Sequence, residues 1–206
     1  MDVLIFGVYE LAVSFLPFLI LMVMYIIKQK QDRKGISVSH VVAVTLFALY
    51  IIGVYYVTEA GTLYDVIYYR LKTATVHIEP FSCEIDLMGY FLNVVMLVPF
   101  GILVPYIWEE LDNPLAITVS GALFSVFVEM TQMLNYRATD IDDVLMNALG
   151  ALTGYYLYNK CRELRSRPCR KNDMSFGILI MAVLATFAGR FFLYDEIWLA
   201  DILYAI

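Results

Sequence analysis

One apolar stretch decides the fold, LMGYFLNVVMLVPFGILVPYIW at Leu87–Trp108, because none of its side chains carries a charge. A helix needs about 20 consecutive apolar residues to cross the hydrocarbon core of a bilayer, so this stretch predicts a transmembrane helix. Five further runs of the same kind lie on either side of it, at Val3–Ile27, Val38–Val57, Leu115–Asn135, Val144–Asn159 and Ser175–Tyr194. The sequence therefore predicts an all-α polytopic membrane protein with six transmembrane helices.

The composition agrees with this prediction and excludes other classes of protein. Hydrophobic residues make up 61% of the chain and charged residues 17%, whereas a soluble domain has roughly 45–50% apolar residues. A soluble domain and a nucleic-acid-binding protein are therefore not expected. Three widely spaced cysteines, Cys83, Cys161 and Cys169, and only two histidines provide neither a disulfide framework nor the usual spacing of metal ligands. No metal site and no cofactor are expected.

The distribution of lysine and arginine predicts the orientation. Basic residues are concentrated in two loops, at 28–34 and 160–171, whereas the loop at 58–86 has only Arg70 and Lys72. Short loops rich in lysine and arginine stay in the cytoplasm. Both termini are therefore predicted to be extracytoplasmic.

The chain divides into four segments on this reading. Residues 1–60 hold two transmembrane helices, residues 61–86 form an outer loop, residues 87–160 hold three transmembrane helices, and residues 161–206 combine a basic cytoplasmic linker with the sixth helix. Within the outer loop, Leu63, Ile67 and Leu71 recur at helical spacing. This pattern predicts a helix that lies in the membrane interface.

Polar residues inside the predicted spans form a second pattern. Glu129 is the sharpest case, because an ionisable side chain near the bilayer centre costs at least about 2.5 kcal/mol and is a functional candidate by default. It belongs to a small and polar face of its helix, made of Gly121, Ser125, Glu129, Gln132 and Tyr136. The next helix carries a matching stripe, made of Asp143, Asn147, Gly150, Gly154 and Tyr158.

These two faces predict a contact between neighbouring helices. Gly150 and Gly154 form a GxxxG pair, which allows the backbones of two helices to approach closely, and the partner can be either of the two preceding spans. Asn93 lies at a similar depth in the span Leu87–Trp108, and Glu10 lies in the outer third of the first span. The polar halves are expected to meet in the outer leaflet.

The loop before the stripe, Asn135–Asp143, holds Arg137, Asp140, Asp142 and Asp143. Thr139 or Asp140 is suited to cap the following helix, and carboxylates at Asp142 and Asp143 suit the positive end of its dipole. Arg137 is close enough along the chain to pair with Glu129 or with Asp140. Such a pair can be purely structural or part of a functional site, and both alternatives stay open here.

The order of these motifs resembles the VanZ family of bacterial membrane proteins. The resemblance rests on Asn93 followed by Pro99-Phe100-Gly101, then Glu129-Met-Thr-Gln132, Arg137, and Asp140-Ile-Asp-Asp143 with Asn147 and Gly150, and it covers about residues 75–160. A Pro80-Phe81 pair before the third span also fits. The resemblance implies a multi-pass protein of the bacterial cell membrane. It also implies a connection with resistance to the lipoglycopeptide teicoplanin, but no catalytic role travels with the motif.

The candidate site follows from the polar residues and this resemblance together. The expected ligand-binding residues are Asn93, Glu129, Gln132, Arg137, Asp140, Asp143 and Asn147, with Pro99 carried over as part of the motif. If the protein is an enzyme, its catalytic candidates are Glu129, Asp140 and Asp143.

Three functions are compatible with these residues. The first is an envelope factor that recognises a lipid-linked wall precursor or a lipoglycopeptide at the outer leaflet, with membrane lipid as its surroundings. The second is an intramembrane enzyme that acts on a lipid or glycolipid headgroup, with Glu129 as general acid or base. The third is a proton-coupled transporter or flippase that uses Glu10 and Glu129, although the polar groups stop in the outer half of the membrane and no inverted repeat is visible. The first is the preferred hypothesis.

Overall fold

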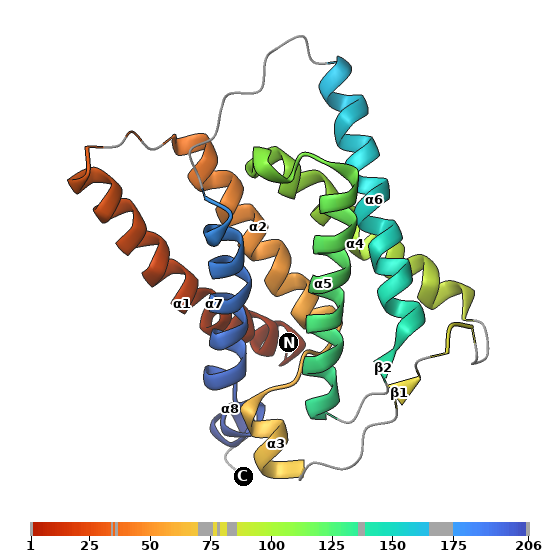
Figure 1. Cartoon of the computed structure of the whole chain (residues 1–206). Coiled ribbons are helices and arrows are strands. Elements are labelled where there is room, and N and C mark those ends of the chain that lie inside the picture. The colour runs from red at the N-terminus through yellow and green to blue at the C-terminus, as the bar shows by residue number, and fades with distance from the viewer. Residues whose placement is uncertain are drawn as a thin grey trace. The chain divides into compact units, whose positions relative to one another are not determined.

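The computed structural model describes residues 2–33, 35, 37–69, 76–77, 79–81, 86–135, 139–164 and 175–204. In that part of the chain nearly all residues are helical (Figure 1). The α-helices are α1 (Asp2–Gln31), α2 (Val38–Val57), α3 (Leu63–Tyr69), α4 (Leu87–Ile107), α5 (Pro114–Gln132), α6 (Ile141–Leu164), α7 (Gly177–Leu193) and α8 (Glu196–Tyr204). Short 3-10 helices occupy Glu109–Leu111 and Met133–Asn135. The predicted all-α class is confirmed.

Two very short strands are the exception to this helical architecture. Strand β1 (Val76–His77) pairs in parallel with β2 (Thr139–Asp140), and the register sets Val76 against Thr139 and His77 against Asp140. This pairing joins the segment that precedes α4 to the start of α6. It lies beside the candidate polar residues at that end of α6.

Four of the described helices, α1, α2, α4 and α5, are long and apolar enough to cross a membrane. Helices α7 and α8 meet the same requirement only as a pair, which is bent by 48° at the break between them. Helix α6 has 24 residues, but its uncharged part is bounded by Asp143 and Lys160 and is shorter than an ordinary span. The described residues thus support four or five spans of a multi-pass membrane protein, and six remains a prediction.

The chain forms two compact units. The first unit contains residues 1–72 and 179–206, and the second contains residues 73–178. In the second unit α4, α5 and α6 lie alongside one another (Figure 1). Its core consists of apolar and aromatic side chains, including Leu97, Val104, Ile107 and Ile117, with Phe100 stacked on Phe124 at a ring separation of 5.5 Å.

Glycines set the distance between α4 and α6. A Cβ atom added at Gly150 would lie 2.2 Å from the carbonyl oxygen of Val94, and one added at Gly154 would lie 2.1 Å from that of Val98. No side chain fits at such distances, because real Cβ contacts stay above about 3.0 Å. The predicted close approach is confirmed, and the structure identifies α4 as the partner.

Local hydrogen bonds explain where the helices of the second unit begin. The carboxylate of Asp86 accepts hydrogen bonds from the backbone of Met88 and Gly89 at the start of α4. Asn113 caps α5 in the same way. At α6, Oδ1 of Asp140 accepts from the backbone N–H of Asp142 at 3.0 Å. Thr139 and Asp140 were the two candidates for the cap, and Asp140 makes this capping hydrogen bond.

The first unit is built around α1, α2 and α7. Its core includes Phe18, Phe47 and Ile51, all fully buried. Gly189 of α7 lies against the α1 backbone, because a Cβ atom there would be 2.4 Å from the carbonyl oxygen of Val13. The hydroxyl of Tyr55 in α2 donates to the carbonyl of Val183 in α7 at 3.0 Å. Three helices are thereby fixed to one another.

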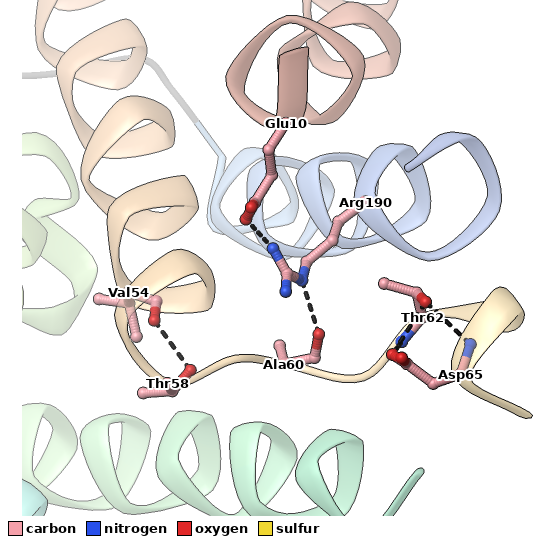
Figure 2. A network of polar contacts seen from close by, with 7 residues as sticks. All are labelled: Glu10, Val54, Thr58, Ala60, Thr62, Asp65 and Arg190. Atoms are coloured by element: carbon pink, nitrogen blue, oxygen red, sulfur yellow. Dashed lines mark hydrogen bonds and ion pairs between the residues drawn. The ribbon is translucent and has the colours of Figure 1, made fainter. Parts of the chain in front are cut away.

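Two short helices accompany this unit. The predicted helix after α2 is present as α3, and its start is held by reciprocal hydrogen bonds between Thr62 and Asp65 (Figure 2). Its location in the membrane interface remains a prediction, and Leu71 lies outside the described residues. Helix α8 was not expected from the sequence. Asp195 caps it by accepting from the backbone of Trp198, and Tyr9 of α1 lies against Tyr194 and Trp198.

Candidate functional site

Asp142 ties the segment before α4 to the start of α6. Its carboxylate is buried, accepts the backbone N–H of Phe81 at 3.0 and 3.1 Å, and accepts the hydroxyl of Tyr90 at 2.6 Å. Phe81 has a φ of 56°, in the left-handed region that residues other than glycine avoid. Such a conformation persists where its surroundings hold it. The hydrogen bonds from Phe81 to Asp142 supply that restraint. Asp142 also lies in the first turn of α6, where a negative charge stabilises the helix dipole.

Two further polar contacts follow along α6. The side-chain amide of Asn93 in α4 donates to Oδ1 of Asp143 at 2.5 Å. One turn later, the buried amide of Asn147 donates to the hydroxyl of Ser125 in α5 at 2.8 Å. The structure therefore brings Asn93, Asp143 and Asn147 to the same end of three packed helices. Among the described residues nothing hydrogen-bonds to Oδ1 of Asn147, which is buried.

Glu129 and Gln132 continue the polar face of α5. Glu129 lies one turn beyond Ser125 and is only 5% exposed, while Gln132 is partly exposed. Gly121, on the same face, lies against Ala151 of α6, since a Cβ atom at Gly121 would be 2.6 Å from that of Ala151. This face of α5 is thus turned into the second unit, where α6 packs against it.

The other expected residues are placed differently. Asp140 is partly exposed and serves as the cap of α6. Pro99 lies within α4, which continues through it as a helix, and is partly exposed. Arg137 lies outside the described residues. Its pairing with Glu129 or Asp140 therefore stays a prediction.

We define the polar cluster of the second unit by the side chains that share this end of α4, α5 and α6: Asn93, Ser125, Glu129, Gln132, Asp140, Asp143 and Asn147. Carboxylates supply acceptors, and the amides supply both donors and acceptors. Within the described ranges, no three His, Cys, Asp or Glu side chains are grouped so that they could hold a metal ion. The arrangement is therefore suited to hydrogen-bonded recognition of a polar group.

A second polar site lies in the first unit, and of its two charged residues only Glu10 was expected from the sequence. Glu10 of α1 forms an ion pair with Arg190 of α7, and both side chains are buried (Figure 2). Nε of Arg190 also donates to the carbonyl oxygen of Ala60 at 2.6 Å, and its guanidinium lies 5.4 Å from the ring centre of Tyr194. The available signal was Arg190 itself, a single charge within the apolar run Ser175–Tyr194.

A third charged contact lies at the far end of α6. Arg162 pairs with Asp112, which follows the 3-10 helix after α4, and its guanidinium lies 5.5 Å from the ring centre of Tyr158. The hydrogen bond to Asp112 raises the pKa of Arg162 above its ordinary value. Because the Arg162 side chain is 43% exposed, this pair is a surface contact rather than a buried site.

Comparison with known proteins places this architecture in a family. Protein VanZ of Enterococcus faecium is 22% identical to this chain over 144 residues, which cover 69% of this chain and 89% of that protein. No solved structure matches the chain. The VanZ/LLP1 family matches residues 14–162, a range that contains α2, α4, α5, nearly all of α6 and the second half of α1. Since this range is well over half of the sequence, the chain belongs to the VanZ/LLP1 family.

Proposed function

We propose that this protein is an envelope factor of the bacterial cell membrane that recognises the polar head of an amphiphile through the polar cluster of the second unit. The observation that carries the proposal is the convergence of amide and carboxylate side chains from α4, α5 and α6 at one end of an otherwise apolar packing. Polar groups inside membrane helices are costly and mark binding sites by default.

The chemistry of the cluster defines the ligand class. Asn147 offers an amide oxygen to which no described residue donates, and Gln132 is partly exposed with both a donor and an acceptor. Sugar and peptide groups present matching donors and acceptors, while an attached alkyl chain can stay in the lipid around the helices. A lipid-linked wall precursor or a lipoglycopeptide has both parts.

Membership of the VanZ/LLP1 family makes teicoplanin-type compounds the first ligands to test. Binding is the first function to test because Asp143, one of the three catalytic candidates, is engaged in an internal hydrogen bond with Asn93 that joins α4 to α6. A carboxylate used in this way is not poised for proton transfer in the same state.

The test combines drug susceptibility with binding. The full chain is expressed in a teicoplanin-susceptible bacterium, and growth is measured with teicoplanin and with a glycopeptide that lacks the acyl chain. We expect reduced susceptibility to teicoplanin only. The purified chain in lipid nanodiscs should also bind teicoplanin, measured by calorimetry.

Two variants make the test specific to the cluster. Gln132→Leu removes the partly exposed amide, and we expect the folded fraction of this variant to lose both the tolerance and the binding. The control is Thr153→Val, which removes an exposed hydroxyl of α6 that donates to the carbonyl of Leu149 in its own helix. Binding that is equal in both variants, or absent in the native chain, would contradict the proposal.

A further inference from the structure

The first unit contains a cavity of about 210 Å³ between α1 and α2. Its lining includes glycines, aliphatic side chains, one tyrosine and one acid: Gly7, Glu10, Leu49, Ile52, Gly53 and Tyr56. An apolar cavity of roughly 150 Å³ accommodates a molecule the size of benzene. The cavity is therefore large enough for several carbon atoms of an alkyl chain.

The cavity opens onto the surface of the unit, where Gly53 and Tyr56 are exposed. A Cβ atom at Gly53 would meet no heavy atom within 4 Å, and one at Gly7 would meet only Tyr56, at 4.0 Å. At the close-packed glycines Gly154 and Gly189, by contrast, an added Cβ atom would have backbone atoms of a neighbouring helix within 3 Å. Gly53 is thus different from these, because helix packing does not require it.

The surroundings of the cavity are apolar. Both helices that form it are long and apolar enough to cross a membrane. Leu11, which also lines the cavity, and the neighbouring side chains Val8 and Leu46 are between 46% and 59% exposed. Exposed aliphatic surface of this kind on a membrane-spanning helix faces lipid. A ligand that enters from this side comes from the membrane and carries an alkyl chain.

Glu10 restricts the charge and the hydrogen-bonding capacity of the head group that such a ligand can carry. Its carboxylate is already paired with Arg190, so the acid that lines the cavity is already charge-balanced. A ligand with its own charge would leave an uncompensated charge in apolar surroundings, which is costly. A neutral group that donates a hydrogen bond can interact with the carboxylate without disturbing that balance.

We propose that the cavity between α1 and α2 binds a neutral amphiphile with a hydroxyl head, which places its alkyl chain against Leu49, Ile52 and Gly53 and donates a hydrogen bond to Glu10. This site is independent of the polar cluster of the second unit. It adds a lipid-type ligand to the protein and gives the Glu10–Arg190 pair a function beyond holding α1 and α7 together.

The experiment uses three photoreactive probes of equal chain length with a diazirine in the chain. One is a long-chain alkanol, the second is its methyl ether, which cannot donate, and the third is the corresponding fatty acid. The full-length protein in nanodiscs is irradiated with each probe at equal membrane concentration, and labelled peptides are quantified by mass spectrometry. We expect the alkanol to label α1 and α2 at least about tenfold more strongly than either other probe, since a hydrogen bond to a charged group is worth about that factor or more.

Gly53→Leu tests the location. The new side chain enters open space, so the variant should fold, and it should abolish labelling by the alkanol. Val42→Leu, an exposed change on the same helix, is the control and should be labelled like the native chain. Equal labelling by alkanol and ether, or by alkanol and fatty acid, would overturn the assignment of the head. Labelling that survives Gly53→Leu in a folded protein would overturn the cavity as the site.

Discussion

At the scale of single residues, Glu10, Arg190 and Asp142 are buried charges with specific partners. Glu10 and Arg190 are 4% and 6% exposed, and neither would be stable alone in apolar surroundings. Asp142 likewise gathers a backbone N–H and a hydroxyl around one buried carboxylate. These contacts decide which segments are held together.

The Glu10–Arg190 pair should behave as a coupled unit. Glu10→Gln or Arg190→Gln alone leaves the other charge buried, and each should cost about 3–5 kcal/mol of stability. The double variant should lose less than the sum of the two. Unfolding of the purified protein by SDS in mixed micelles measures these differences.

Arg162→Gln provides the control for this cycle, because its pair with Asp112 is partly exposed. It should cost less than about 1 kcal/mol. Losses from Glu10→Gln and Arg190→Gln that simply add would show that the two side chains act independently.

Asp142 should control the backbone of Phe81. Asp142→Leu removes the acceptor of the Phe81 N–H, and we expect exchange of this amide with deuterium to accelerate at least about tenfold, since hydrogen bonds to charged groups are worth about 1.5–3 kcal/mol. Asp142→Asn keeps one acceptor oxygen and should have a smaller effect. Unchanged exchange in Asp142→Leu would mean that other contacts hold this segment.

At the scale of elements, the closest packing in the second unit is between α4 and α6. Gly150 and Gly154 touch the α4 backbone, and Gly101 of α4 touches that of α6. Small residues allow such close approach, which provides dispersion contacts that lipid would otherwise supply. The polar contacts of Asn93 and Asn147 then fix the register of the three helices at one end.

Two identical substitutions test this packing. Gly154→Ala would bring its Cβ atom within 2.1 Å of a backbone carbonyl, so the helices must separate, at a cost of about 1–3 kcal/mol. Gly53→Ala places the same methyl group in open space and should stabilise the protein by about 0.5–1 kcal/mol through helix propensity. Thermal unfolding in detergent compares the two, and equal effects would contradict the close contact.

At the scale of the whole molecule, the orientation in the membrane determines which ligands reach each site. The chain carries an exposed cysteine, Cys161, near the end of α6, next to the basic loop that we predict to be cytoplasmic. Glu79 is exposed in the segment before α4, which we predict to be outside. The two positions lie on opposite sides of the membrane in that topology.

Labelling with a membrane-impermeant thiol reagent checks the orientation. In a protein whose Cys83 and Cys169 are replaced by serine, Cys161 should react only after the cells are permeabilised. In the same background, with Cys83 and Cys169 replaced, a variant that carries Glu79→Cys together with Cys161→Ser should react in intact cells. The reverse pattern would show that the polar cluster faces the cytoplasm, and the proposed outer-leaflet ligands would then be excluded.

The class of the fold and much of the local structure could be predicted from the amino-acid sequence. Long uncharged runs can be stable in a bilayer only as helices, because every backbone polar group must be bonded within the segment. A cap at Thr139 or Asp140 and the small face around Gly150 and Gly154 also follow from short-range rules. All of these depend on residues within a few turns of one another.

Contacts between groups that are distant in the sequence could not be predicted and came from the packing of the helices. The sequence left two helices as partners for Gly154, and the structure shows α4. The sequence indicated no partner for Glu10, whereas the structure pairs it with Arg190 from near the other end of the chain. Helix α8 and its contact with Tyr9 were likewise not foreseen. The physical reason is that helical periodicity identifies which face of a helix is buried but not which helix covers it, since every apolar face is equally compatible with lipid and with any neighbour.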